Sequence, residues 1–194
     1  MKTLVLIIFL VLTSIITLLG QTKKDSLYVF VGEKIEILQV QPNKVDYLGD
    51  NIVRAKYKVI ENFFGNYKKD TVEFEASFHC GEDLFSKFKN VLLFISNYNG
   101  KFYLEKYQYY DVYKTIDGKW ASPGDTSKFG YYHTGSFKPH HIQFIDTVSY
   151  DIRQLDRGCL MRKAFPEPYY KIVGNKAIAL MGAYIDELFI IKKR

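Results

Sequence analysis

Apolar and polar residues alternate along the first half of the chain, a pattern that predicts β-strands. The alternation is clearest in residues 52–64, where apolar side chains from Val53 to Val59 are separated by basic ones from Arg54 to Lys58. Such a strand buries one face and hydrates the other. Alternation, or a continuous apolar run in the case of residues 91–95, predicts four further strands at residues 25–40, 71–78, 91–95 and 101–113.

The segments between these strands carry turn and helix signals. Residues 97–100 read Asn-Tyr-Asn-Gly and predict a hairpin, because Asn-Gly tolerates positive φ. Apolar residues at Leu84, Phe85 and Phe88 predict a short helix over residues 82–88. Gly32 inside the first strand predicts a bulge or a tight bend. Five strands with a short helix between the third and fourth are the order of an OB-type barrel, which we favour over a β-sandwich.

Residues 114–194 are predicted to form a β-containing C-terminal extension packed on the barrel. Alternation between Ile142 and Ile152 predicts a strand pair, and residues 169–181 predict a hairpin that turns at Gly174. Residues 183–191 have helical spacing, but they are apolar all round, so a strand remains the alternative.

Three segments of the predicted barrel together resemble the netrin-like family, which shares its OB-type barrel with the tissue inhibitors of metalloproteinases. They are the opening strand at residues 25–34, the second strand with its aromatic-glycine end at residues 57–65, and Cys80-Gly81 followed by the apolar run at residues 91–94. The resemblance covers roughly residues 25–110 and implies the same barrel.

The chain departs from the inhibitors where their activity resides. Those proteins chelate the zinc of the protease with an N-terminal Cys, whereas the first Cys here is Cys80. The resemblance therefore does not imply metalloproteinase inhibition by that route. The family also tends to place a Cys after the fifth strand, where this chain is rich in Tyr.

The first twenty residues have the pattern of a signal peptide. Lys2 precedes an apolar run of 16 residues, from Leu4 to Leu19, and Gly20 is small enough to precede a cleavage site. An uncleaved anchor is the alternative. We therefore expect an exported protein, periplasmic or secreted, with a barrel at residues 21–113 and the extension at residues 114–194; it meets a membrane only through the leader if the leader is retained.

Two cysteines, Cys80 and Cys159, are present. In an oxidising compartment they could form one disulfide, which would close a loop of about eighty residues. Two buried free thiols are the alternative. We favour the disulfide because export is expected, although the sequence does not show whether the two residues lie close together.

The sequence argues against several chemistries. It holds no Gly-x-Ser-x-Gly elbow, no phosphate-binding glycine loop and no His-Glu-x-x-His zinc motif. His140 and His141 are adjacent, so in a strand they face opposite ways; a cluster of His133 with one of them and Asp146 is the least unfavourable metal site. We predict no catalytic residue, no metal and no cofactor.

Aromatic residues are unusually frequent, at 16% of the chain. Tyr107, Tyr109 and Trp120 are the candidate binding surface, with burial inside the barrel as the alternative. The formal net charge of +6, or +5 without Lys2, is too small to indicate nucleic acid, which some OB barrels bind.

The function expected from these features is non-catalytic binding of a protein or glycan at the cell envelope or outside the cell. A protease-inhibitor-like module without the N-terminal Cys is the first alternative. A hydrolase with an unrecognised site is the second.

Overall fold

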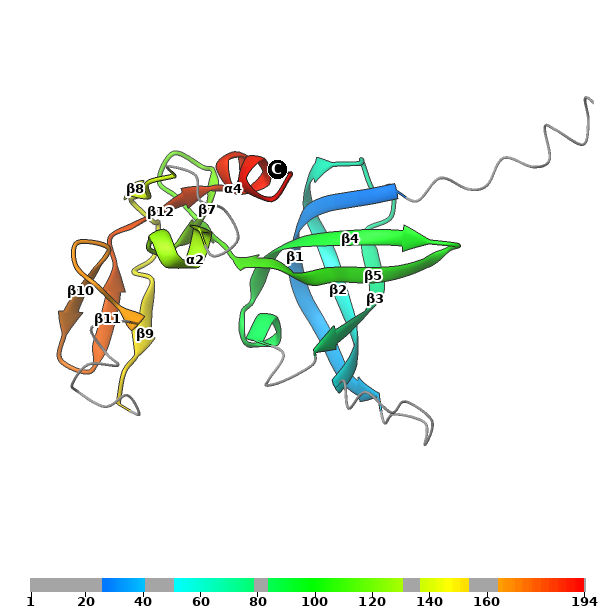
Figure 1. Ribbon diagram of the computed structural model, residues 1–194, viewed down its shortest axis with the longest axis horizontal. Helices are drawn as coiled ribbons and strands as arrows, with labels where there is room; N and C mark the ends of the chain where they lie inside the picture. The colour runs from blue at the N-terminus through cyan, green and yellow to red at the C-terminus, as the bar shows by residue number, and fades with distance from the viewer. Residues whose placement is uncertain (1–25, 41–50, 79–83, 131–136, 154–163, 194) are drawn as a thin grey trace, which may run out of the picture.

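Five strands close a barrel in the computed structural model, which describes residues 26–40, 51–78, 84–130, 137–153 and 164–193 (Figure 1). They are β1 (Ser26–Val40), β2 (Asn51–Phe64), β3 (Thr71–Phe78), β4 (Asn90–Tyr98) and β5 (Lys101–Asp111). The strand order is β1-β2-β3-β5-β4, and β4 pairs with β1 to close the barrel. All pairs are antiparallel except that of β3 with β5. This order confirms the predicted OB-type barrel.

The barrel interior is filled with aromatic rings. The short 3₁₀ helix η1 (Leu84–Lys87) follows β3 and carries Phe85, which is fully buried. The Phe85 ring lies 5.7 Å from Phe78 and 6.1 Å from both Tyr57 and Phe74, measured between ring centroids. Truncation of a buried Phe usually costs about 3–5 kcal/mol, so this ring contributes much of the stability at its end of the barrel.

Gly32 allows β1 to bend around this interior. The pairing of β1 with β2 changes register between Val31 and Gly32, so the predicted irregularity is present. A Cβ at Gly32 would lie 3.0 Å from atoms of both Leu93 and Tyr57. The two side chains therefore fill the space that any residue other than glycine would need at this point.

The described residues of the extension form two small sheets and two helices. One sheet has the order β6-β7-β12-β8 and the other β10-β11-β9. The bounds are β6 (Tyr113–Lys114), β7 (Trp120–Pro123), α2 (Thr126–Gly130), β8 (His140–His141), β9 (Ser149–Asp151), β10 (Tyr170–Val173), β11 (Lys176–Ala179), β12 (Met181–Tyr184) and α4 (Ile185–Lys193). No helix in the part of the chain that the structure describes has both the length and the apolar character to cross a membrane.

Two expectations for the extension are confirmed and one is wrong. The hairpin is β10–β11, and the C-terminal segment forms the helix α4 rather than a strand. The strand pair expected between Ile142 and Ile152 does not form, because β8 pairs with β12 and β9 pairs with β11. The alternation identified extended backbone, but each of these two short strands completes its hydrogen bonds with a strand from the end of the chain.

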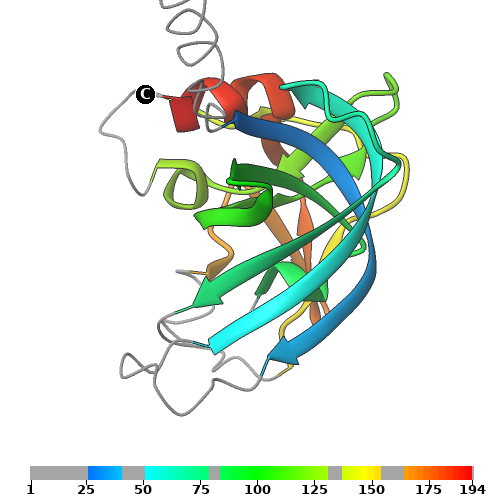
Figure 2. The same cartoon turned by 90° about the vertical axis from the view of Figure 1, so that its right-hand side faces the viewer.

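The extension packs on the outer face of the barrel through one apolar cluster. Residues of β1, β4 and β5 contribute the barrel side, and β7, α2, β12 and α4 contribute the other side. The fully or largely buried members are Val29, Val31, Leu92, Phe94, Tyr110, Val112, Trp120, Phe129, Ala183, Ile185 and Leu188. In Figures 1 and 2, α4 lies at the same end of the barrel as the start of β1.

A buried carboxylate lies at this junction. Asp111, the last residue of β5, is 3% exposed. It accepts a hydrogen bond from Tyr150 Oη of β9 at 2.8 Å and is ion-paired with Lys128 Nζ of α2. Ser122 Oγ of β7 lies 3.5 Å from the same carboxylate. Asp111 thus joins the barrel to both sheets and to a helix of the extension.

These contacts compensate the cost of burying a charge. An ionised carboxylate is expensive to remove from water unless it is paired and hydrogen-bonded. Lys128 Nζ also donates to the carbonyl of Pro123 at 2.6 Å, and its backbone N–H donates to Asp125 Oδ1 at 3.0 Å, which caps α2. Both the backbone N–H and the Nζ group of Lys128 are therefore held by hydrogen bonds.

The phenols around Asp111 are perturbed by this environment. Burial, and then the Asp111 carboxylate, raise the pKa of Tyr150 and that of Tyr113 well above the ordinary value of 10.0. Burial is also the main cause of the raised pKa of Tyr170. A phenol with a raised pKa stays protonated in the folded chain while the unfolded chain ionises. Its contribution to stability is therefore complete below pH 10 and is lost as the pH rises above that value.

Replacement Tyr150→Phe tests this junction. At pH 7 we expect the free energy of unfolding to fall by about 1–2 kcal/mol, because Asp111 loses a buried hydrogen bond. Above pH 10 the decline of stability with pH should be shallower than in the native chain, since one fewer phenol ionises on unfolding. Urea unfolding at several pH values measures both effects, with Tyr98→Phe, an exposed phenol, as the matched control. An unchanged alkaline profile in Tyr150→Phe would contradict the assignment.

Candidate functional site

The aromatic surface predicted from the sequence is not assembled in the structure. Tyr109 is half-buried and packs against Phe85 of the barrel core, with 5.7 Å between ring centroids. Trp120 is only 5% exposed, because it lies between the barrel and the extension. Its Nε1 donates to Glu61 Oε2 at 2.9 Å, and Lys114 Nζ lies 4.3 Å from the ring centroid. The side chain of Tyr107 is outside the described part of the structure.

Other sequence candidates also fall outside the described residues. Cys80, Cys159 and His133 all belong to this group. The disulfide between Cys80 and Cys159 therefore stays a prediction. Of the histidines, the structure describes His140 and His141, which are consecutive residues of β8.

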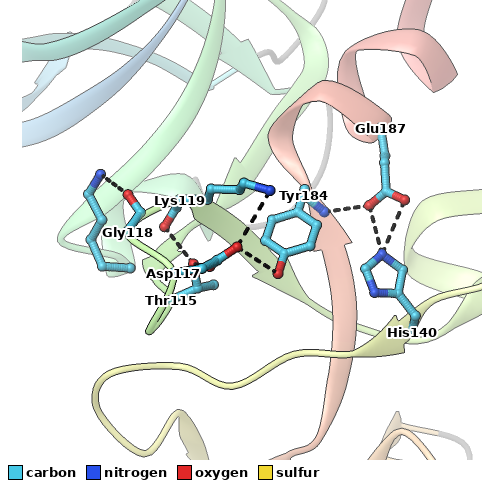
Figure 3. A network of polar contacts seen from close by, with 8 residues as sticks. Thr115, Asp117, Gly118, Lys119, His140, Tyr184 and Glu187 are labelled. Atoms are coloured by element: carbon cyan, nitrogen blue, oxygen red, sulfur yellow. Dashed lines mark hydrogen bonds and ion pairs between the residues drawn. The ribbon is translucent and has the colours of Figure 1, made fainter.

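His140 joins a polar network on the surface of the extension (Figure 3). Its Nε2 lies 3.1 Å and 3.0 Å from the two carboxylate oxygens of Glu187 on α4. The second of these oxygens also accepts a hydrogen bond from the backbone N–H of Tyr184 at 2.7 Å. Glu187 thus caps the first turn of α4, as an acidic residue at the third helical position commonly does. The acid that meets His140 is Glu187 and not Asp146, the partner considered from the sequence.

The network continues to the turn between β6 and β7. The Tyr184 ring lies between His140, at 5.4 Å between ring centroids, and Lys119 Nζ, at 5.0 Å from the ring centroid. Tyr184 Oη donates to Asp117 Oδ2 at 3.4 Å, and Lys119 Nζ lies 3.5 Å from the same oxygen. A hydrogen bond from Thr115 is the main cause that lowers the pKa of Asp117. Burial raises the pKa of Tyr184.

This network stabilises the fold, and its geometry is not that of a metal site or a catalytic site. The Tyr184 ring has His140 and Lys119 as neighbours, and the Glu187 carboxylate is used by the helix cap. A metal centre needs three or more converging ligands. Among the described residues, no group of three His, Cys, Asp or Glu side chains is placed to hold a metal ion.

A groove on the barrel is the stronger candidate. It lies over β2, β3 and the β4–β5 turn, where β3 and β5 pair through only one residue couple, Glu75 with Tyr103. The cavity has a volume of about 310 Å³. Its lining residues are Arg54, Glu73, Phe74, Glu75, Gly100, Lys101 and Phe102. The face formed by strands 2 and 3 with the loop between strands 4 and 5 is where OB barrels commonly bind ligands.

Cross-strand ion pairs form one wall of the groove. Arg54 of β2 is opposite Glu75 of β3 and its guanidinium lies 3.4 Å from the carboxylate. Lys56 is opposite Glu73 in the same way, at 3.0 Å. All four side chains are more than a third exposed, so each pair is worth about 0–1 kcal/mol and a ligand can replace it at low cost.

The hairpin turn and Phe102 complete the groove. Asn99 and Gly100 have φ values of 51° and 87°, as the Asn-Gly pattern predicts, and Asn97 Oδ1 accepts a hydrogen bond from the Gly100 N–H at 2.9 Å. This turn holds Lys101 at the rim, while Tyr98 at the turn is 58% exposed. Phe102 is half-buried against the barrel core and offers its remaining surface to the groove.

The signal for this groove was present in the sequence. The outward positions of residues 52–64 are basic and those of residues 71–78 are acidic, so antiparallel pairing of the two strands brings opposite charges together. The missing information was that β3 and β5 barely pair, which opens the cavity beside them. Comparison of the chain with models of protein families, with curated proteins and with solved structures finds no match.

Replacement Glu187→Ala distinguishes a helix cap from a chemical site. We expect a loss of about 1 kcal/mol in the free energy of unfolding, because the N–H of Tyr184 loses its acceptor. Replacement His140→Ala keeps this cap and removes a partly exposed pair and a ring contact with Tyr184, so its effect should be within about 0.5 kcal/mol. Thermal unfolding of the two variants measures the difference. Equal losses would show that the His140 contact, and not the cap, is the stabilising interaction.

Proposed function

We propose that the chain is an exported, non-catalytic module that binds a protein or glycan partner through the groove over β2, β3 and the β4–β5 turn. The observation that carries the proposal is a cavity lined by Phe74, Phe102 and charges of both signs, located on the face that OB barrels use for ligands. Export rests on the signal-peptide pattern of residues 1–20.

The charges in the groove indicate the chemistry of the partner. Arg54 and Lys101 supply two positive groups, and Glu73 and Glu75 supply two negative groups. A polyanion would bring its phosphates close to the two carboxylates, which disfavours nucleic acid here. Sugar hydroxyls, or a polypeptide loop with side chains of both signs, can use all four groups as hydrogen-bond partners.

The volume of the cavity limits the size of what enters it. About 310 Å³ is at the lower end of ordinary ligand pockets. That space suits one sugar ring or one or two amino-acid side chains. The partner therefore inserts a small group between the ion-pair wall and the β4–β5 turn, and its remaining contacts lie on the rim.

The groove supports binding more than hydrolysis. A hydrolase with two carboxylates uses one of them as a proton donor. Here Glu73 forms an ion pair with Lys56, and Glu75 forms one with Arg54. The residues that line the groove include no Ser, Cys or His. The barrel topology also supports the resemblance to the netrin-like family, in which protease inhibition is one known role; that role stays our second candidate.

Capture on immobilised residues 21–194 tests the proposal. Envelope extract, culture supernatant and a glycan array are applied to the native chain and to the double variant Arg54→Ala, Lys101→Ala. We expect the variant to bind its partner at least about tenfold more weakly, because two of the four polar groups of the groove are removed. The matched control is Lys68→Ala, Lys69→Ala, which removes two exposed charges from the β2–β3 turn.

Each outcome is informative. A partner lost from the groove variant and kept by the control supports the proposal, and its identity separates a glycan from a protein. A retained protease whose activity falls on binding favours the inhibitor. A glycan that is cleaved rather than retained overturns the non-catalytic assignment. Equal retention by both variants moves the site away from this groove.

A further inference from the structure

The turn between β4 and β5 contains the one Asn-Gly dipeptide of the chain. Of the eight Asn residues in the sequence, Asn99 alone is followed by Gly. Both turn residues are exposed and have positive φ, 51° at Asn99 and 87° at Gly100. A Cβ built on Gly100 would meet no atom within 4 Å, so the space beside its backbone nitrogen is open. Water therefore has access to the bond between the two residues.

The side chain of an Asn that precedes Gly can react with the main chain. The Gly nitrogen loses its proton and attacks the side-chain carbonyl carbon, so that a nitrogen–carbon bond forms and the amide group leaves as ammonia with that proton. Water then opens the resulting succinimide ring at one of its two carbonyl groups. One opening gives Asp, and the other gives isoaspartate, in which the main chain runs through the side chain. Gly favours the attack because it has no Cβ to obstruct the nitrogen.

A hydrogen bond at Gly100 opposes this reaction in the folded chain. The N–H of Gly100 donates to Oδ1 of Asn97 at 2.9 Å. An amide oxygen is too weak a base to remove the proton, so the bond holds the hydrogen on the nitrogen that has to lose it. If this bond must break before the attack, its modest free energy corresponds to a factor of about two to ten in rate.

The turn between β2 and β3 provides a matched comparison. Asn66 also has positive φ, 47°, and the N–H of the next residue, Tyr67, donates to Oδ1 of Asn62 at 3.0 Å. The two turns therefore share the backbone conformation of the Asn and the hydrogen bond that opposes attack. They differ in the residue that follows, since Tyr67 is 8% exposed and packs in the barrel core. Rotation of its nitrogen toward Asn66 would move a buried ring, so Asn66 should stay intact.

The turn between β6 and β7 provides a second comparison. It contains Asp117-Gly118, the one Asp-Gly dipeptide of the chain. A hydrogen bond from Thr115 lowers the pKa of the Asp117 carboxyl, which favours the ionised form. A carboxylate repels an attacking nitrogen anion and has no ammonia to release. Asn99-Gly100 is therefore the position where an uncharged amide and an unhindered nitrogen coincide.

We propose that Asn99 is a self-modification site at the rim of the groove and that Asn97 limits the rate of its conversion. The reaction replaces a neutral amide with a carboxylate two residues before Lys101, and isoaspartate adds one carbon atom to the main chain of the turn. Gly100 and Lys101 both line the groove. Because the groove has two basic and two acidic side chains, a further carboxylate at its rim gives it a net negative charge.

The conversion of Asn99 needs no partner, whereas its effect on binding rests on the proposed function of the groove. Replacement Asn99→Asp has the charge of one product, so capture of partners by this variant measures that effect. The chemistry is measured separately by mass. Failure to capture a partner would count against the proposed function and would leave the measurement on Asn99 unaffected.

Incubation of the folded chain at mildly alkaline pH, followed by tandem mass spectrometry, tests the proposal. The mass change locates each Asn that has lost ammonia and gained water. We expect Asn99 to be converted first and Asn66 to stay intact over the same time. Replacement Asn97→Ala should accelerate conversion at Asn99 by about two- to tenfold. Replacement Asn97→Asp keeps an acceptor oxygen and should react at close to the native rate.

Unfolding in urea supplies the control for the Asn97 variants. The hydrogen bond to Gly100 is absent from the unfolded chain, so the native chain and Asn97→Ala should then react at the same rate. Circular dichroism verifies that each variant is folded before incubation without urea.

Three results would overturn the proposal. The first is an intact Asn99 in the folded chain after a time that converts the unfolded chain, because the turn would then prevent ring closure. The second is an equal rate at Asn99 in the folded native chain and in folded Asn97→Ala, which would exclude Asn97 as the limiting group. The third is conversion of Asn66 before Asn99.

Discussion

The buried carboxylate of Asp111 is the constraint on which the arrangement of barrel and extension depends. A single charge at the end of β5 is compensated by groups from α2, β7 and β9, which belong to three different parts of the extension. If the extension moved away, Asp111 would lose its partners while apolar surface on β1 and β4 became exposed. Directional contacts at one buried charge therefore determine where the extension sits, and the surrounding apolar cluster supplies most of the stability.

One alternating pattern creates both the core and the groove. In β3 every second side chain is buried, and the buried Phe74 packs on Phe85 and Tyr57. The intervening Glu73 and Glu75 face outward and meet the bases of β2. A strand with period two necessarily presents its polar residues together on the outer face, so the charge ladder follows from the same sequence that fills the barrel.

The barrel could be predicted from the sequence because its strands are long and regular. β3 begins and ends at the residues that alternation indicated, and the Asn-Gly turn and the short helix with Phe85 are where local signals placed them. The extension could be predicted less well, since its strands are two to four residues long and their partners are distant in sequence. The pairing of β8 with β12 joins segments about forty residues apart, and no local sequence pattern predicts it.

The residues of the candidate site also divide into those that the local sequence predicts and those that depend on contacts between distant segments. The charges of β2 and β3 are visible in the sequence, but the weak pairing of β3 with β5 that opens a cavity beside them is a property of barrel closure. Trp120 looked like a surface residue because it lies in a polar segment rich in turns. Its burial comes from the apolar cluster between barrel and extension, and Glu61 accepts the hydrogen bond of its indole N–H. The contact of Phe189 with Phe63 and Phe64 likewise exists only because α4 packs at the end of β2.

The central claim is that barrel and extension form one cooperative unit, and Trp120 reports on it directly. It is the only Trp of the chain and lies between the two parts. Guanidinium unfolding of residues 21–194 is followed by Trp fluorescence, which detects the junction, and by far-ultraviolet circular dichroism, which detects the strands. We expect both signals to change with the same midpoint. A fluorescence transition complete at a denaturant concentration where the strand signal is still native would contradict the claim, because the extension would then detach from an intact barrel.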